Sequence, residues 1–246
     1  LNEFILHYQP VVSLRTGTVT GFEALVRWEH PQRGLIQPAD FIPVAEETGL
    51  IVPIGRWVLG EALRQISEWH QLHPREEPLS IGVNLSVKQF SQPDLIDQIT
   101  RALETTGAQA TSLKLEITEA AIIDKGQAAI AILKRIRELG VQVYLDDFGT
   151  GYSSLSYLHG LPIDALKIDR AFVGSMDVDD KNLRLVRTIL TLAEITGLRA
   201  EAEGVSTAEQ LRELRLLNCD HGQGYLFSAA ITREAVDEVL TANPVW

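Results

Sequence analysis

The sequence predicts an α/β fold, a modified TIM-type (β/α)8 barrel with an antiparallel first strand. Strand-like and helix-like segments alternate along the chain, and in its second half the strands recur about every 30 residues, the size of a βαβ unit. The length of 246 residues fits a single barrel, since such folds run to about 250 residues. The first two predicted strands have no helix between them, so they are expected to pair antiparallel.

Eight segments have the features of strands, because they are short and either rich in β-branched and aromatic residues or alternating with period two. They are Phe4–Val12, Val19–Trp28, Ser80–Leu85, Ser112–Ile117, Val141–Asp146, Ala165–Ile168, Leu198–Ala202 and, as the weakest, Gly222–Phe227. Helical periodicity occupies most of the intervals. The predicted helices are Ile54–Gln71, Pro93–Thr106, Gln127–Leu139, Lys181–Thr196 and Ala208–Leu216. Gly107, Gly140 and Gly197 follow three of them, where a C-terminal cap is expected.

The composition restricts the possible partners. Lys and Arg number 22 and Asp and Glu 33, so the formal net charge is −11 and the pI is near 5.0. This disfavours binding to a DNA or RNA polymer or to an anionic membrane, which needs a basic face. No apolar run reaches the roughly 18 residues needed to cross a bilayer, so direct membrane insertion by this segment is not expected.

One cysteine and the start of the chain bear on its context. Cys219 is the single cysteine and cannot form an internal disulfide, which favours a reducing, cytoplasmic location. The chain begins at Leu1 rather than at Met, and no Gly/Ser-rich or Pro-rich linker divides it. We therefore expect residues 1–246 to be one domain cut from a longer protein, which could carry a membrane anchor elsewhere.

Polar residues alternate with aliphatic ones in the predicted strands. In Ser112–Ile117, period two separates Leu113 and Leu115 from Lys114 and Glu116. Since helices cover the outside of a barrel, the polar face should point toward the barrel axis. The carboxyl ends of the parallel strands meet at one end of the barrel, its mouth, where the active sites of such folds lie. The polar residues late in their strands are Asn84, Glu116, Asp146, Lys167 and Glu203, with Asp147 one step further and Glu23 on the second strand.

Such a cluster requires cations. Two carboxylates about 4 Å apart repel by roughly 4 kcal/mol at an effective dielectric near 20, and Lys167 alone cannot offset four or five of them. Oxygen ligands from Asp, Glu and Asn suit Mg²⁺ or Mn²⁺, and the adjacent Asp146 and Asp147 could serve two ions in a phosphoryl displacement. A structural interpretation stays open, because an acidic residue after a strand often caps the next helix, and Lys167 with Asp169 could form a plain salt bridge.

Nine strings along the chain carry a resemblance to a known family. The run EALVRWEHP contains Glu23-Ala24-Leu25. The other strings are YQPVV at 8–12, FIPVAEETGLI at 41–51, GVNLS at 82–86, LEITE at 115–119, DDFGTGYSSLSYL at 146–158, LPIDALKIDR at 161–170, AEGV at 202–205 and QGYLFS at 223–228. Together they cover essentially the whole chain, which resembles the EAL-domain family of cyclic di-GMP phosphodiesterases, bacterial second-messenger enzymes.

The resemblance implies hydrolysis of cyclic di-GMP to linear pGpG with Mg²⁺ or Mn²⁺, two ions in the site. By position, it implies that one metal is held by Glu23, Asn84, Glu116 and Asp146. It implies that the second metal is held by Asp146, Asp147 and Glu203. The implied catalytic residues are Lys167, which would orient the attacking water, Glu203, proposed as a base, and Glu23.

Further contacts also follow from the resemblance alone. Arg27 matches a phosphate-contacting arginine, a role that its fork geometry suits, and Gln9 and Gln223 match positions near the ligand. Glu119 matches a residue that anchors the loop Gly149–Ser154 and couples metal occupancy to loop order. A homodimer formed through outer helices is expected on the same basis.

One position departs from the family's usual string AEGVET, since Ser206 stands where the second Glu belongs. This departure keeps open a catalytically silent receptor for cyclic di-GMP. Glu201, on the same strand face as Glu203, is also unusual and could compensate or raise the pKa of Glu203. Without the resemblance, a Mg²⁺-assisted enzyme that abstracts a proton with Lys167 as its base is a further alternative.

Overall fold

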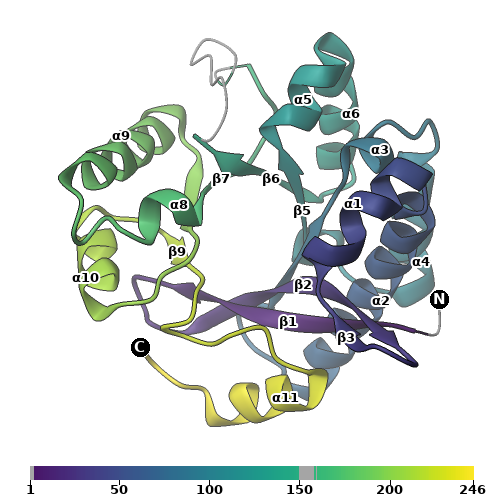
Figure 1. Ribbon diagram of the computed structural model, residues 1–246, viewed down its shortest axis with the longest axis horizontal. Coiled ribbons are helices and arrows are strands. Elements are labelled where there is room, and N and C mark those ends of the chain that lie inside the picture. The colour runs from purple at the N-terminus through teal and green to yellow at the C-terminus, as the bar shows by residue number, and fades with distance from the viewer. Residues whose placement is uncertain (1–2, 150–157, 159) are drawn as a thin grey trace.

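The strands of the protein close into a barrel (Figure 1). The computed structural model describes residues 3–149, 158 and 160–246. The strands are β1 (Phe4–Ser13), β2 (Val19–His30), β3 (Gly34–Ile36), β4 (Ser80–Asn84), β5 (Leu113–Thr118), β6 (Gln142–Phe148), β7 (Ala165–Ile168), β8 (Arg199–Ala202) and β9 (His221–Gly222). They follow the order β1-β9-β8-β7-β6-β5-β4-β2, pairing of β1 with β2 closes the ring, and β3 adds an arm to β2. The predicted barrel is confirmed.

The first strand runs against its neighbours, as predicted. β1 pairs antiparallel with both β2 and β9, whereas the pairs from β2 through β4 to β9 are parallel. A short turn joins β1 to β2, and Gly17 in it has a φ of 74°. A Cβ at Gly17 would lie 2.5 Å from the Trp246 carbonyl oxygen, so this turn requires glycine both for its backbone and for its space.

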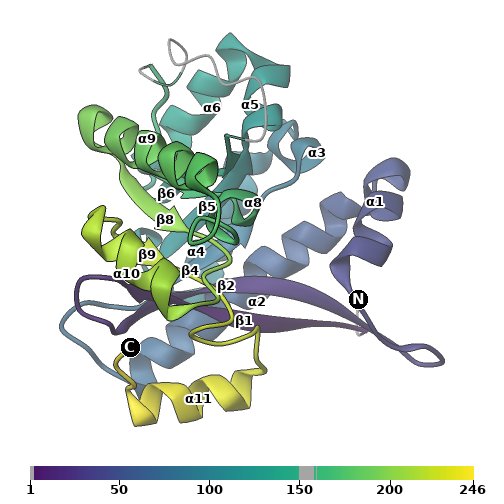
Figure 2. The same ribbon diagram turned by 60° about the vertical axis from the view of Figure 1, so that its left-hand side comes forward.

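Helices surround the barrel (Figures 1 and 2). They are α1 (Pro38–Thr48), α2 (Ile51–Leu72), α3 (Val87–Phe90), α4 (Leu95–Thr106), α5 (Glu119–Lys125), α6 (Gln127–Glu138), α8 (Arg170–Val173), α9 (Asp180–Thr196), α10 (Ala208–Leu216) and α11 (Arg233–Ala242), with a 3₁₀ turn at Ala110–Ser112. All five predicted helices are present, as α2, α4, α6, α9 and α10. Gly107, Gly140 and Gly197 have φ values of 67°, 88° and 69°, which confirms the predicted glycine ends. In the described part of the chain, no helix has the length and apolar character needed to span a membrane.

Several segments differ from the sequence-based expectation: helices α1, α3, α5, α8 and α11 and strand β3 were not predicted, and one predicted strand is too long. The predicted strand Gly222–Phe227 is wrong beyond Gly222, because the chain turns at Gly224, whose φ is 157° and whose added Cβ would lie 2.2 Å from the Val205 carbonyl oxygen. The amides of Phe227 and Ser228 both donate to the Gly224 carbonyl, which closes the turn. Helix α1 was not predicted, since Pro43 lies inside it and interrupts a helical pattern.

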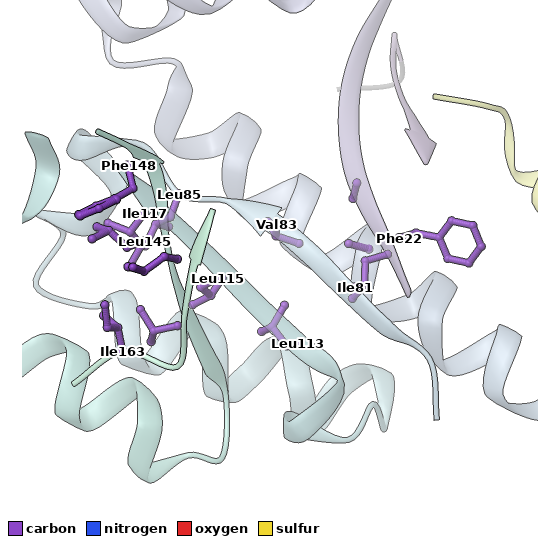
Figure 3. Close-up of a cluster of buried hydrophobic side chains, with 14 of the residues drawn as sticks. Phe22, Ile81, Val83, Leu85, Leu113, Leu115, Ile117, Leu145, Phe148 and Ile163 are labelled. Atoms are coloured by element: carbon purple, nitrogen blue, oxygen red, sulfur yellow. The ribbon is translucent and has the colours of Figure 1, made fainter. Parts of the chain in front are cut away.

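The two faces of the strands separate by polarity. Leu113, Leu115 and Ile117 of β5 are fully buried on the outward face. Figure 3 shows them clustered with apolar side chains from neighbouring strands such as Ile81 and Leu145. Because the helices and the outward face share this apolar core, the polar residues of the same strands are left to fill the inside of the barrel.

Candidate active site

Inward-facing polar side chains converge where the parallel strands end. Apart from Glu23, which lies in the first half of β2 near the end of its pairing with β4, each sits at or just beyond the late part of its strand, so the mouth predicted from strand direction is present. We call these residues the mouth cluster: Glu23 on β2, Asn84 on β4, Glu116 on β5, Asp146 on β6, Lys167 on β7 and Glu203 directly after β8. The sequence-based expectation of convergence is therefore confirmed for all six.

Lys167 lies at the centre of the mouth cluster and is fully buried. Its Nζ is 2.5 Å from Glu116 Oε2 and 2.6 Å from Glu203 Oε1. It is 3.6 Å from Asp146 Oδ1 and 3.7 Å from Glu23 Oε2. Burial alone lowers the pKa of Lys167, but the surrounding negative charges, led by Glu116, outweigh it and hold that pKa well above its ordinary value. These neighbours therefore favour the charged form of the lysine.

The carboxylates exceed the charge of the lysine. Four carboxylates contribute −4 and Lys167 contributes +1, which leaves a formal −3. Burial, followed by the charge of Glu23, raises the pKa of Glu116 well above its ordinary value. Burial also raises the pKa of Glu203 to about 7, with Asp146 and Glu23 adding to it and Lys167 opposing it. Excess negative charge of this size favours the binding of a further cation.

Hydrogen bonds fix the Glu23 carboxylate from both sides. Asn84 Nδ2 donates to Glu23 Oε1 at 2.6 Å, and Gln223 Nε2 donates to Glu23 Oε2 at 2.7 Å. Gln223 Nε2 also donates to Gln9 Oε1 at 2.9 Å, and Gln9 Nε2 donates to the Ser228 carbonyl at 3.1 Å. Gln9 and Gln223 thus lie beside the mouth cluster, and the amides keep Glu23 in one orientation.

A cleft of about 720 Å³ opens above the mouth cluster, a size typical of small-molecule sites. Its lining comprises Gln9, Glu23, Leu25, Asp146, Asp147, Asp169, Arg170, Ala171, Gly174, Glu203, Gly204, Gln223, Gly224 and Tyr225. Sequence reasoning did not assign Arg170 or Tyr225 to the site. The strings LPIDALKIDR and QGYLFS contain both, so a closer reading of these strings is the signal that could have found them.

Some predicted residues lie at the edge of the cluster rather than in it. Asp147 lines the cleft from a left-handed backbone with a φ of 54°. Its pKa is raised by burial and then by the charges of Asp146 and Asp169. Arg27 is half-buried and donates to the Val26 carbonyl at 2.9 Å.

The predicted loop anchor is Glu119, the first residue of α5. Of the loop Gly149–Ser154, residues 150–154 lie outside the described residues. Ser206 is exposed, and its amide donates to Gln210 Oε1 at 2.7 Å. The replacement of Glu by Ser at this position therefore falls at the start of α10 (Ala208–Leu216).

The donor set of the cluster fits a hard divalent metal, because it consists of carboxylate and amide oxygens with excess negative charge. The carboxylates surround the Lys167 ammonium rather than a position that a metal ion could occupy. Accordingly, within residues 3–149, 158 and 160–246, no three Asp, Glu, His or Cys side chains are spaced as ligands of one ion. Chemically the residues suit Mg²⁺ or Mn²⁺, while their present geometry is that of a lysine-centred cluster.

The fold and the site together define an α/β-barrel protein with an acidic, lysine-centred pocket at the carboxyl ends of its strands. The chain belongs to the EAL domain family, whose model matches residues 1–230. It is 42% identical over 237 residues to the cyclic di-GMP phosphodiesterase NbdA of Pseudomonas aeruginosa, covering 96% of this chain and 30% of that protein.

Two further similarities come from MucR and Bd1971. The bifunctional diguanylate cyclase/cyclic di-GMP phosphodiesterase MucR of Pseudomonas aeruginosa is 43% identical over 232 residues, which is 94% of this chain and 34% of MucR. The PaMucR phosphodiesterase in complex with c-di-GMP superimposes with a TM-score of 0.91 at 42% identity, covering 96% of this chain and 94% of that one. The EAL enzyme Bd1971, with cAMP and cyclic di-GMP bound, gives 0.92 at 37% identity, covering 97% and 65%. The chain thus spans about a third of the length of its curated relatives.

Proposed function

We propose that residues 1–246 form a single metal-dependent phosphodiesterase domain that hydrolyses cyclic di-GMP to linear pGpG. The observation that carries this proposal is the complete mouth cluster, in which a buried lysine contacts four carboxylates below an open cleft. The printed activities of NbdA and MucR and the c-di-GMP complex of PaMucR support the choice of substrate.

We propose Mg²⁺ or Mn²⁺ as the cofactor, with two ions in the site. One would be held by Glu23, Asn84, Glu116 and Asp146. The other would be held by Asp146, Asp147 and Glu203. Bound there, such ions lower the pKa of a water molecule and offset the charge that develops on the phosphate. The net charge of the cluster and its oxygen-only donors support this assignment.

The protein's own residues would handle the water and its proton. Lys167 would donate a hydrogen bond to the attacking water, since its ammonium stays protonated. Glu203 lies 2.6 Å from Lys167 and its side chain lines the cleft, so its carboxylate would accept the proton as the water oxygen bonds to phosphorus. The bond from phosphorus to the ribose 3′ oxygen breaks, and that oxygen takes a proton from solvent.

The printed activities of the relatives favour hydrolysis over the proton-abstraction alternative, because NbdA and MucR are cyclic di-GMP phosphodiesterases.

Around the reacting phosphate, Arg27 would contact a phosphate oxygen, and Gln9 and Gln223 would contact the ligand from the floor of the cleft. Their positions beside Glu23 support these roles.

The wider setting is proposed on the sequence alone. The domain would act in the cytoplasm and would form homodimers through outer helices. Sedimentation of the purified domain at several concentrations measures the oligomeric state, and a monomer at all of them would contradict the dimer.

Product analysis by chromatography tests the function. We expect cyclic di-GMP to be converted to pGpG with Mg²⁺ or Mn²⁺ and to persist with a chelator. Glu23→Ala should lower turnover by about a thousandfold, because it removes a charged ligand. The matched control is Lys134→Met on the exposed side of α6, which should retain wild-type turnover. Saturated binding of cyclic di-GMP without product would contradict hydrolysis and would favour the silent receptor.

A further inference from the structure

A second polar layer fills the barrel beneath the mouth cluster. We call Lys114, Tyr144, Glu201 and His221 the floor layer; they lie on β5, β6, β8 and β9. Each precedes a site residue by two positions: Glu116, Asp146, Glu203 and Gln223 respectively. Because inward-facing residues recur every two positions along a strand, the floor layer lies one step deeper in the barrel than the mouth cluster.

One ion pair compensates the charge of the floor layer. Lys114 Nζ lies 3.8 Å from Glu201 Oε2 and 4.8 Å from the centroid of the Tyr144 ring. Lys114 and Glu201 are 5% and 1% exposed. In the described part of the chain, neither carboxylate oxygen of Glu201 accepts a hydrogen bond, and Lys114 is the one cation within 4 Å of it. Among these residues Lys114 is therefore the one ion-pair partner of Glu201. Arg199 also lies beside the Tyr144 ring, 5.7 Å from its centroid, but it is exposed and its charge is screened by solvent.

The backbone of Glu201 also lies next to that of Lys167. Lys167 of β7 and Glu201 of β8 are register partners in adjacent parallel strands, which run about 4.8 Å apart. Both side chains face inward and both are buried. The Lys167 ammonium nevertheless contacts the carboxylates of the mouth cluster, Glu116 and Glu203 most closely. Lys167 thus has an alternative anionic partner below it, which Lys114 occupies.

We propose that Lys114 is a positioning residue: by pairing with Glu201, it keeps this carboxylate from drawing the Lys167 ammonium down and away from the mouth. The inference rests on the proposed hydrolysis, in which Lys167 orients the water from its mouth position. If Lys114 is lost, Glu201 becomes a buried carboxylate without an ion-pair partner among the described residues. The buried cation on the neighbouring strand, Lys167, can then compensate it.

The two partners have unequal roles in this arrangement. Removing the charge of Lys114 leaves an anion that competes for Lys167. Removing the charge of Glu201 leaves no such competitor, so Lys167 keeps its place. If the ion pair were purely structural, neutralising either partner would lower the free energy of unfolding, and with it turnover, by about the same amount. One buried charge is left uncompensated in each case.

A double-mutant cycle on the full chain with Mg²⁺ tests the inference. We expect Lys114→Met to lower kcat by about tenfold with KM within about twofold, because the water loses its orienting cation while substrate contacts persist. Glu201→Gln alone, and in combination with Lys114→Met, should keep kcat within about threefold of the wild type. The matched control is Lys134→Met, which removes an exposed lysine from α6.

The outcomes separate this inference from the proposed function. No product from the wild type would contradict the function itself. A productive wild type with an equally productive Lys114→Met, or a double variant as slow as Lys114→Met, would overturn the role of Lys114. Should Lys114→Met fail to fold, Glu201→Gln decides: the inference expects it to fold and to keep wild-type turnover, whereas in a purely structural pair it would be destabilised about as much as Lys114→Met.

A measurement independent of turnover follows the ammonium directly. A crystal structure of metal-free Lys114→Met should show Lys167 Nζ within hydrogen-bond reach of Glu201 and displaced from Glu203, from which it is now 2.6 Å. In the double variant, Lys167 should return to Glu203. An unchanged Lys167 in Lys114→Met would contradict the inference whatever the rates are.

Discussion

The mouth cluster and the floor layer contain the same kinds of groups, a lysine and carboxylates on adjacent strands, but hold them differently. At the mouth, Lys167 contacts two carboxylates at 2.5 and 2.6 Å, and two more lie within 3.7 Å. In the floor layer, Lys114 and Glu201 are 3.8 Å apart, and the carboxylate lacks hydrogen bonds to the described residues. The mouth thus has an excess of anions, whereas the floor pair is balanced.

The inside of the barrel therefore holds charged groups in two ways, in excess at the mouth and in balance in the floor layer. The mouth opens on a cleft, so its excess negative charge can be offset by ligands from solvent. The floor pair is buried, and its charges must balance within the protein, because an uncompensated buried charge is strongly destabilising. Charge excess is therefore found where exchange with solvent is possible, and charge balance where it is not.

The largest expected effect comes from breaking the mouth. Lys167→Met removes the cation from among four carboxylates, so without metal the free energy of unfolding should fall by about 3 kcal/mol or more. Turnover should fall by about a thousandfold, because the water loses its positioning donor. Urea unfolding in the presence of a chelator and product analysis measure the two effects. Stability and turnover close to the wild type would show that the cluster does not depend on its lysine.

The floor layer should respond to acid. Burial, followed by the charge of Lys114, lowers the pKa of His221 to about 4 from an ordinary 6.5. Above pH 6.5, His221 is neutral in both the folded and the unfolded protein, so it does not reduce the free energy of unfolding. Between pH 6.5 and 4 the unfolded state alone binds it, so at pH 5 this histidine should lower the free energy of unfolding by about 2 kcal/mol.

The variant His221→Gln isolates this contribution from those of the carboxylates at the mouth. Relative to the wild type, it should gain about 2 kcal/mol between pH 7 and pH 5, as measured by urea unfolding at both values. If the difference in the free energy of unfolding between the two proteins does not change with pH, the pKa of His221 is not lowered in the folded protein.

A smaller effect is expected at the edge of the mouth. Arg27→Ala should raise KM for cyclic di-GMP by about tenfold while kcat stays within about threefold, because a phosphate contact made before and during the reaction is lost. Arg27→Lys should recover little of the loss, since an ammonium lacks the planar fork of the guanidinium. Steady-state kinetics decides, and a fall in kcat with unchanged KM would instead place Arg27 with the reacting groups.

The smallest effect is expected outside both layers. Ser206→Glu restores the residue usual in the family, yet Ser206 is exposed and its amide and hydroxyl contact Gln210. Turnover should therefore change by no more than about twofold. A rise beyond about tenfold would connect this position to the mouth and would explain how a single substitution tunes the family's activity.

Local pattern was enough for much of the fold. β-Branched or aromatic content and period-two alternation identified seven of the eight strands of the ring, and the 3.6-residue period identified five helices. Of the predicted last strand, Gly222–Phe227, only Gly222 belongs to β9, because the chain turns at Gly224 against Val205, a contact between segments that no local pattern contains. Helix α1 escaped detection because Pro43 resembles a boundary although the helix continues through it.

The sequence by itself determined which side chains face the barrel axis and at which end they gather, since alternation and strand direction are local properties. Only the tertiary structure decided the partners: Glu116 and Glu203 against Lys167, Gln223 against Glu23, and Lys114 against Glu201. The physical reason is that a contact across the barrel depends on closure, register and rotamer. Period two fixes the face of a residue and leaves these three free.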